Sequence, residues 1–378
     1  MASLASLKPE RYFPATFMYK MQTTTFNYDN GTGAQNFSWF DGLCSGDEDN
    51  NLGAQLSILF YFMFAFSLFG NGLVLVIINR FERLTTVTNI LLLNLVLSSL
   101  IFMSSLPFTG IYMQLSNWIF GTAMCKIVGS VYYLGFYSSV LFLTLLTFDR
   151  HLAVVYSLAA SQVRNQSYAV ASCAVVWMVS SLACIRPMLL LNTFVYMDEK
   201  TYCEEYPGAL PYVDVEQLRT SGFYIQLFLF LILPLVVIIY CYVRIAITVI
   251  SSKIATKFRT VRLIFFIVLL FFICWTPFNI TMLMHDEVSD CEEAQKLGYA
   301  LQITRNIAYI YFCISPIFYT FVGKKFQNYF RQLLVKRFPG LKKYVSVSEN
   351  SKTNMSTKST RNNDGNQTVV LLLQGSAV

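Results

Sequence analysis

Four cysteines lie outside the apolar stretches of this chain, and thiols in such positions can form disulfide bonds. They are Cys44, Cys125, Cys203 and Cys291, whereas the other five of the nine cysteines lie inside apolar stretches, where they are expected to be small buried side chains. An even set in an oxidising compartment predicts two disulfide bonds. Four cysteines allow three pairings, and the sequence does not choose between them.

The remaining reactive residue types do not form a catalytic or metal-binding pattern. No group of cysteines and histidines has the spacing of a zinc site. No candidate nucleophile is accompanied by a base in a recognisable arrangement. The sequence therefore predicts a protein that is not an enzyme and that needs neither a metal nor a cofactor.

Charged and helix-bending residues stand out inside the apolar stretches. Asp149 and Arg150 are adjacent at the end of one stretch, and because a lone charge at membrane depth is costly, they are expected to compensate each other. Prolines remove a backbone hydrogen bond and bend helices. Two of them have distinctive neighbours, in Cys274-Trp275-Thr276-Pro277 and in Ser315-Pro316-Ile317-Phe318-Tyr319.

Seven long apolar stretches carry these residues and must position them. They lie at 55–79, 88–112, 126–148, 169–191, 221–250, 261–284 and 297–322. Each reaches the ~20 residues that a helix needs to cross a bilayer, and each is far longer than a barrel strand of ~9–11 residues. The chain is 55% hydrophobic, with a mean hydropathy of +0.50. We predict an all-α membrane protein, a seven-transmembrane helix bundle.

The charges between the stretches predict the orientation of the bundle. With the N-terminus outside, most of the 21 acidic residues fall on the outer side and most of the 28 Lys and Arg fall on the inner side. An excess of Lys and Arg in short loops marks the cytoplasm. We therefore expect a multi-pass protein of the plasma membrane with an extracellular N-terminus. The net charge of +7 does not indicate nucleic-acid binding, since no soluble basic domain is present.

The composition divides the chain into four parts. They are an extracellular tail (1–52), the bundle (53–322), a short amphipathic eighth helix in contact with membrane lipid (323–338) and a disordered cytoplasmic tail (339–378). The first tail has no recognisable cleavable signal peptide. It carries two N-glycosylation sequons, at Asn30 and Asn36. The last four residues, 375–378, match a short pattern that binds PDZ domains.

Several motifs follow one another along the chain in a specific order. They are Gly70-Asn71, Leu93-Asn94-Leu95, Cys125, Asp149-Arg150, Trp177, Cys274-Trp275-Thr276-Pro277 and Pro316-x-x-Tyr319. Each motif alone is weak, but the ordered set resembles the rhodopsin-like G-protein-coupled receptors over roughly residues 50–338. Within that family, Trp118-Ile119-Phe120-Gly121 and residues 149–155 resemble the chemokine receptors. Residues 291–301 and Arg305-Asn306 resemble the XC-type (lymphotactin) receptor.

The resemblance implies a ligand and a site for it. It implies a receptor that binds a basic extracellular chemokine and that pairs Cys125 with Cys203 and Cys44 with Cys291. The ligand-binding residues would be Tyr28, Tyr132, Tyr133, Glu204, Glu205, Asp286 and Arg305. Tyr28 is a candidate for sulfation. Most chemokine receptors carry Glu where this chain has Arg305.

The resemblance also implies a switch that activates a heterotrimeric G protein of the inhibitory class, with chemotaxis and calcium signalling as the output. Outward movement of the sixth span would open a groove for a helix of the G protein. The switch and coupling residues would be Asp149, Arg150, Tyr242, Phe271, Trp275, Pro277, Pro316 and Tyr319. Phosphorylation of Ser and Thr in the last tail would create a site for arrestin.

Three departures from the family pattern keep an alternative open. Ser99 replaces the Asp that helps to hold a sodium ion, His151 replaces the Tyr of Asp-Arg-Tyr, and Ser315 replaces the Asn of Asn-Pro-x-x-Tyr. They are compatible with an atypical scavenging chemokine receptor that binds its ligand without G-protein signalling. A transporter or channel is disfavoured, because the spans contain no Asp or Glu apart from Asp149.

Overall fold

The computed structural model describes residues 52–81, 86–156, 164–195, 200–205, 215–252, 258–287, 291–322, 324–338 and 340. Tyr28, Cys44 and both glycosylation sequons lie outside these residues, as do the Ser and Thr of the C-terminal tail and the PDZ-binding pattern. The predictions made for them remain predictions.

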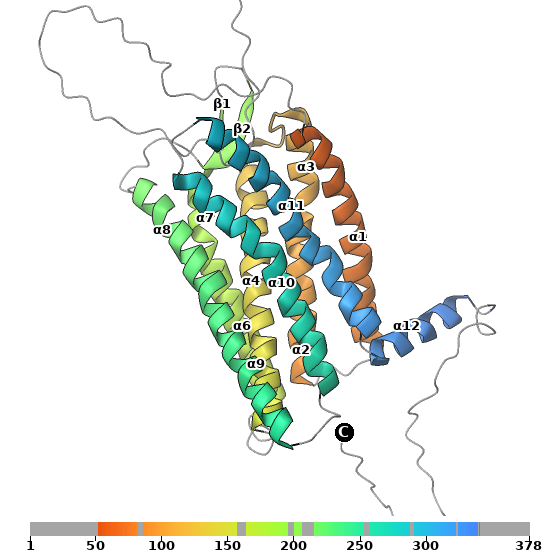
Figure 1. Cartoon of the computed structure of the whole chain (residues 1–378). Helices are drawn as coiled ribbons and strands as arrows, with labels where there is room; N and C mark the ends of the chain where they lie inside the picture. The colour runs from red at the N-terminus through yellow and green to blue at the C-terminus, as the bar shows by residue number, and fades with distance from the viewer. Residues whose placement is uncertain are drawn as a thin grey trace, which may run out of the picture. The chain divides into compact units, whose positions relative to one another are not determined.

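Long helices form a bundle within the first unit of the chain (Figure 1). Seven spans follow one another: α1 (Leu52–Phe81); α2 (Val87–Ser104) with α3 (Leu106–Leu115); α4 (Gly121–Val155); α6 (Gln166–Ala183) with α7 (Ile185–Leu190); α8 (Val215–Leu227) with the π-helical turn η1 (Phe228–Ile232) and α9 (Leu233–Ser252); α10 (Phe258–Glu287); and α11 (Cys291–Val322). Six of these spans are long and apolar enough to cross a membrane, counted over the described residues. The seventh, α11, packs against α10 and α1 and completes the seven-transmembrane bundle.

Prolines account for three of the interruptions within spans. Pro107 lies at the start of α3, where its missing N–H falls at a helix beginning, and the chain turns at Ser105. Pro187 lies in the first turn of α7 in the same way. Pro234 follows the π-helical turn η1, because proline leaves a carbonyl of the preceding turn without its usual donor. By contrast, α10 continues through Pro277.

The core of the bundle is aromatic. Trp275, Tyr311, Phe102, Phe136 and Phe142 are among the largest fully buried side chains. Large apolar residues also remain exposed on the outward faces of the helices, as expected for helices that contact lipid rather than water. Sequence hydropathy therefore identified the spans but not the inner faces of the helices.

A two-stranded antiparallel sheet lies near one end of α4 (Figure 1). It consists of β1 (Leu191–Val195), which directly follows α7, and β2 (Thr201–Glu205). Thr193 stands opposite Cys203 in the register. The short helix α12 (Lys324–Arg337), which corresponds to the predicted eighth helix, has the basic residues Lys336 and Arg337 in its last turn.

Candidate functional site

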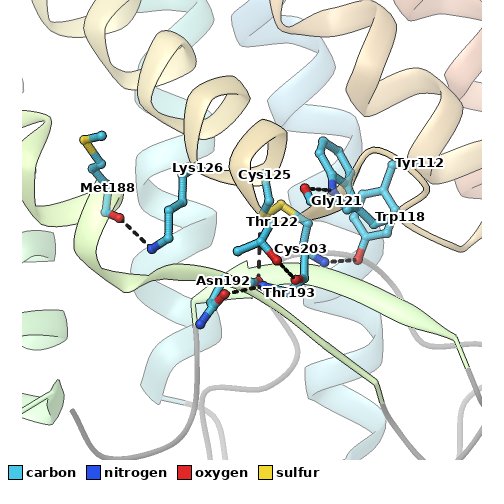
Figure 2. The surroundings of a disulfide bond; sticks show 10 residues. All are labelled: Tyr112, Trp118, Gly121, Thr122, Cys125, Lys126, Met188, Asn192, Thr193 and Cys203. Carbon is cyan, nitrogen blue, oxygen red and sulfur yellow. Dashed lines mark hydrogen bonds between the residues drawn. A yellow bond between two sulfur atoms is a disulfide. The ribbon is translucent and has the colours of Figure 1, made fainter. Parts of the chain in front are cut away.

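A disulfide bond between Cys125 and Cys203 fastens β2 to the first turns of α4 (Figure 2). The two residues are 78 positions apart in the sequence. This bond is the predicted first pairing, and it is confirmed. Of the second predicted pair, Cys44 lies outside the described residues, and Cys291 begins α11 with a side chain that is not described. We call this end of the bundle, with Cys125, β1 and β2, the disulfide end.

Hydrogen bonds hold the turn between α3 and α4 against the sheet. The Trp118 amide donates to the Thr201 carbonyl at 2.8 Å, and its indole Nε1 donates to the Gly121 carbonyl at 2.9 Å. The Trp118 ring packs edge to face on Tyr112, with ring centroids 5.5 Å apart. On α4, Lys126 Nζ donates to the Met188 carbonyl at 2.9 Å (Figure 2). The turn between α3 and α4 is therefore bonded to β2, and α4 is bonded to α7, in addition to the disulfide bond.

An ion pair links α7 to β2, and its acid is one of the predicted ligand-binding residues. Arg186 of α7 contacts Glu205 of β2, with Nη2 and Oε1 3.1 Å apart, and its Nε donates to the Leu218 carbonyl at 3.0 Å. Gly222 leaves space for this side chain, since a Cβ there would overlap the guanidinium group. Tyr133 of α4 lies close enough to interact with both Arg186 and Glu205. Glu205 is therefore already paired within the protein.

The other predicted contact residues separate into two groups. Tyr132 lies next to Tyr309 of α11, with ring centroids 5.9 Å apart, and both tyrosines interact electrostatically with Arg305. Glu204 lies instead beside Tyr112 near the disulfide bond. The backbone of Asp286 lies in the last turn of α10, and its side chain is not described.

Aromatic rings connect this region to the middle of the bundle. The Trp275 ring lies 4.2 Å from that of Phe136 and 5.9 Å from that of Phe271, measured between centroids. Phe102 stacks on Phe312 at 4.0 Å and contacts Tyr132 at 4.9 Å. The Trp275 and Phe312 rings, 6.1 Å apart, join the two groups, so the predicted switch residues Trp275 and Phe271 are connected to Tyr132 through ring contacts.

Ser99 stands where the family has an Asp that helps to hold a sodium ion, and local hydrogen bonds account for its hydroxyl and for the nearby Asn71 side chain. Ser99 Oγ donates to the Leu95 carbonyl at 3.0 Å, within its own helix. Asn71 Nδ2 donates to Ser67 Oγ at 2.8 Å and to the Phe312 carbonyl at 3.2 Å, which joins α1 to α11. The described residues contain no group of His, Cys, Asp or Glu side chains that could hold a metal ion.

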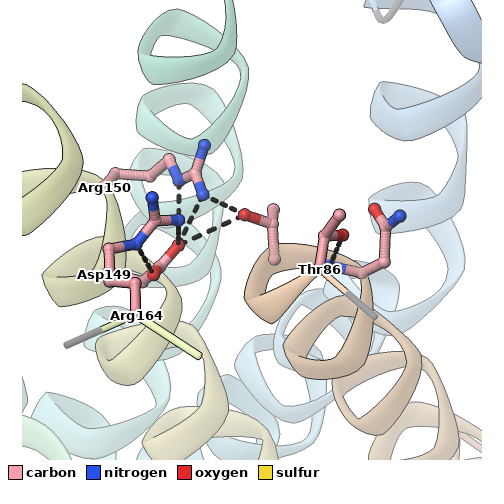
Figure 3. Close-up of polar contacts among 6 residues, drawn as sticks. Thr86, Asp149, Arg150 and Arg164 are labelled. Atoms are coloured by element: carbon pink, nitrogen blue, oxygen red, sulfur yellow. Dashed lines mark hydrogen bonds and ion pairs between the residues drawn. The ribbon is translucent and has the colours of Figure 1, made fainter. Parts of the chain in front are cut away.

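Asp149 is shared by two arginines at the opposite end of α4 (Figure 3). Arg164 makes a bidentate contact, with Nε 2.6 Å from Oδ1 and Nη2 3.0 Å from Oδ2. Arg150 Nη2 lies 2.5 Å from Oδ2. Thr88 of α2 donates to the same oxygen at 3.2 Å and also accepts a hydrogen bond from Arg150. We call this end the Asp149 end.

Other side chains near the Asp149 end make mainly aromatic contacts. Tyr242 of α9 packs edge to face on Phe265 of α10, with centroids 5.2 Å apart. His151 is buried between Phe148, Tyr156 and Tyr240, and neither ring nitrogen has a hydrogen-bond partner in the part of the chain that the structure describes. The side chains of two further predicted residues, Pro316 and Tyr319 of α11, are not described.

Two arginines of these clusters were missed by sequence reasoning. The sequence treats Arg164 as one of many inner loop cations, although it engages Asp149 with two hydrogen bonds. Arg186 lies in an apolar stretch, and its contact with Glu205 depends on the β2 strand being tied to α4. A charged residue within a span is the signal that could have pointed to Arg186.

Comparisons with known proteins agree with this architecture. The family model described as 7 transmembrane receptor (rhodopsin family) matches residues 70–319. C-C chemokine receptor type 3 of Cavia porcellus is 34% identical over 315 residues, which cover 81% of this chain and 86% of that protein. C-C chemokine receptor type 1 of Homo sapiens is 34% identical over 83% of this chain and 88% of its own length. C-C chemokine receptor type 8 of Homo sapiens is 32% identical over 79% of this chain and 84% of its own length.

These relatives are C-C type receptors, and they do not support the narrower XC-type prediction. The family match spans the helices that carry the Asp149 end, Trp275 and Arg305. The chain belongs to the rhodopsin family of seven-transmembrane receptors, within its chemokine-receptor branch.

Proposed function

We propose that this chain is a chemokine receptor of the plasma membrane that activates a heterotrimeric G protein of the inhibitory class. The observation that carries the proposal is the 34% identity to two C-C chemokine receptors over more than four fifths of the chain. Chemotaxis and calcium signalling are the expected outputs, and a phosphorylated C-terminal tail would engage arrestin.

The disulfide end is the proposed extracellular side. Disulfide bonds persist in oxidising compartments, so the Cys125–Cys203 bond favours an extracellular position for β1 and β2. The Asp149 end then faces the cytoplasm, which agrees with its two arginines and with the excess of basic residues in that loop set. A basic chemokine would be attracted by the acidic residues of the outer segments, which favour rapid association more than final affinity.

The proposed signal passes through the aromatic core. A ligand that contacts Tyr132 from the disulfide end touches rings that continue through Phe102 to Phe312 and Trp275. A ligand shifts such a receptor toward the active state to the extent that it binds that state better. Movement of α10 would separate Tyr242 from Phe265 and leave Arg150 free to contact a G-protein helix.

Binding of purified chemokines tests the ligand class directly. Labelled C-C and XC-type chemokines are titrated onto cells that display the receptor, and saturable binding of at least one of them is expected. Arg150→Ala should keep this binding and lose G-protein activation, whereas Arg80→Ala, which removes an exposed cation from the last turn of α1, should keep both. Failure of every chemokine to bind would overturn the proposal.

A scavenging receptor is the second candidate. The observation in its favour is His151, which stands where the family has Tyr and whose ring nitrogens make no hydrogen bond among the described residues. Chemokine binding and uptake with no G-protein activation by the unmodified receptor would decide for this candidate. A PDZ-domain partner at residues 375–378 is a separate proposal, tested by pull-down with a C-terminal peptide that has or lacks Val378.

A further inference from the structure

Arg305 is a half-buried cation on α11, and one edge of its guanidinium group is buried without a partner among the described residues. Arg305 Nε and Nη2 have almost no exposed surface and no hydrogen-bond partner, and Arg305 makes none of the ion pairs found among the described residues. Leaving a buried charge uncompensated is costly, more so among apolar rings than in water. A group that supplies a negative charge to this edge would therefore be bound favourably.

The same protein shows which group this edge of an arginine accepts. Arg164 uses its Nε and Nη2, the two nitrogens that are unpartnered in Arg305, to hold both oxygens of Asp149, at 2.6 Å and 3.0 Å. Two parallel N–H groups match the planar carboxylate in a bidentate contact. The free edge of Arg305 has the same geometry and lacks its carboxylate.

Neighbouring amide oxygens extend the unpartnered surface. Gln302 lies about one turn before Arg305 on α11 and Asn306 directly follows it, and the two are only 5% and 4% exposed. Asn306 Nδ2 donates to the Gln302 backbone carbonyl at 2.8 Å, which fixes the amide so that Oδ1 is left as an acceptor. Oδ1 of Asn306 and Oε1 of Gln302 have no donor among the described side chains and backbone. These two acceptors suit the N–H groups that a ligand segment carries along with its carboxylate.

The two acidic side chains of β2 have interactions elsewhere. Glu205 pairs with Arg186 at 3.1 Å, and Glu204 interacts with Tyr112. Arg305 instead interacts with the phenol groups of Tyr132 and Tyr309, which carry no formal charge at neutral pH. Tyr132 lies about two turns of α4 from Cys125, so this cluster is on the disulfide-end half of the helix.

We propose that the Nε–Nη2 edge of Arg305, with Gln302 and Asn306, is a subsite for a carboxylate of the ligand segment that enters the bundle. The inference rests on the proposed function for the identity of the ligand as a chemokine. It adds that a basic ligand must present an acidic group at its inserted end. Arg305 would then select, among ligands with a net positive charge, those that carry an acidic group at the inserted end.

The first experiment needs no ligand and so separates this inference from the proposed function. Thermal unfolding is measured for the purified full-length receptor in lipid nanodiscs. Arg305→Met, which removes a half-buried charge with an unpartnered edge, is expected to raise Tm, whereas Arg164→Met, which breaks a satisfied pair, is expected to lower it. A lower Tm for Arg305→Met would reveal a partner within the chain, such as Asp286, and would overturn the inference.

The same preparation tests the carboxylate directly. Sodium acetate, compared with sodium chloride at equal ionic strength, should raise the Tm of the unmodified receptor and leave that of Arg305→Met unchanged. Equal shifts in both proteins would mean that acetate acts elsewhere, and the inference would fail whatever the chemokine panel shows.

The chemokine that binds in the panel provides the last test. Each Asp or Glu of its flexible end is changed to Asn or Gln. One change should weaken binding to the unmodified receptor by about tenfold or more and should have no further effect on Arg305→Met. Arg305→Lys should recover part of the binding, because it keeps the charge but loses the bidentate contact. Additive losses at every acidic position would contradict a direct contact with Arg305.

Discussion

Replacing Asp149 with asparagine removes a negative charge that two arginines share. The carboxylate is fully buried, whereas the side chains of Arg150 and Arg164 keep 16% and 22% of their surface exposed. Asparagine keeps one acceptor oxygen but turns an NH₂ donor toward the guanidinium groups. The variant therefore leaves two partly buried cations close together with no compensating charge.

The magnitude follows from the burial of the three side chains. Removing one partner of a buried ion pair costs about 3–5 kcal/mol. Because both arginines retain some exposure, we expect the lower end, about 3 kcal/mol of the free energy of unfolding. With about 2 °C of Tm per kcal/mol, as for larger domains, the expected decrease in Tm is on the order of 6 °C.

Thermal unfolding of the purified receptor in nanodiscs measures this decrease. Glu205→Gln is the matched control, since Glu205 pairs with a single arginine that also has a backbone partner, and it should cost less. Adding Arg164→Met to Asp149→Asn should restore part of the loss, because it removes one of the two uncompensated cations. An unchanged Tm for Asp149→Asn, or a further loss in the double variant, would refute the reasoning.

Three further changes probe the fold. Gly135→Ala should strongly reduce the amount of folded receptor, because a Cβ there overlaps the backbone of Phe102 and forces α2 from α4; normal yield and Tm would contradict this packing. Trp177→Phe removes the 2.9 Å hydrogen bond to Asn94 and should cost about 1 kcal/mol in chemical unfolding, so that an unaltered midpoint would show the bond to be unimportant. Cys203→Ser should abolish chemokine binding by receptor that reaches the cell surface, since β2 loses its bond to α4; binding with unchanged affinity would disprove this role.

The seven spans were predictable because lipid imposes a strict requirement on the sequence. A helix that crosses a bilayer needs a long apolar run. A stretch such as residues 221–250 therefore predicts a span without any knowledge of packing. The interruptions at Pro107 and Pro187 are also visible in the sequence. The inner face of each helix was not predicted, since residues that face lipid are as apolar as those that face the core.

The disulfide bond and the ion pairs were predictable to different degrees. The four candidate cysteines left three pairings open, and only the family resemblance selected Cys125 with Cys203. The sequence placed Asp149 beside Arg150 but could not show Arg164, because that contact depends on how α6 is positioned against α4. Tertiary packing decides such contacts, and a single sequence carries no direct record of it.

The predicted ligand-binding acids illustrate the limit of counting charges. The sequence counts Glu205 as an outer acid available to a basic ligand. The structure instead pairs it with Arg186, an arginine inside a span. Arg305 shows the reverse, since its unpartnered edge becomes visible only when the neighbouring side chains are in place.

Nucleotide exchange on a purified inhibitory-class G protein tests the central claim most directly. The receptor is reconstituted in nanodiscs, and exchange is followed with and without the chemokine that binds in the panel. We predict that the chemokine accelerates exchange with the unmodified receptor and not with Arg150→Ala, although both bind it equally. Equal exchange with and without the chemokine, in a receptor that binds it, would contradict the claim that binding at the disulfide end is transmitted to the Asp149 end.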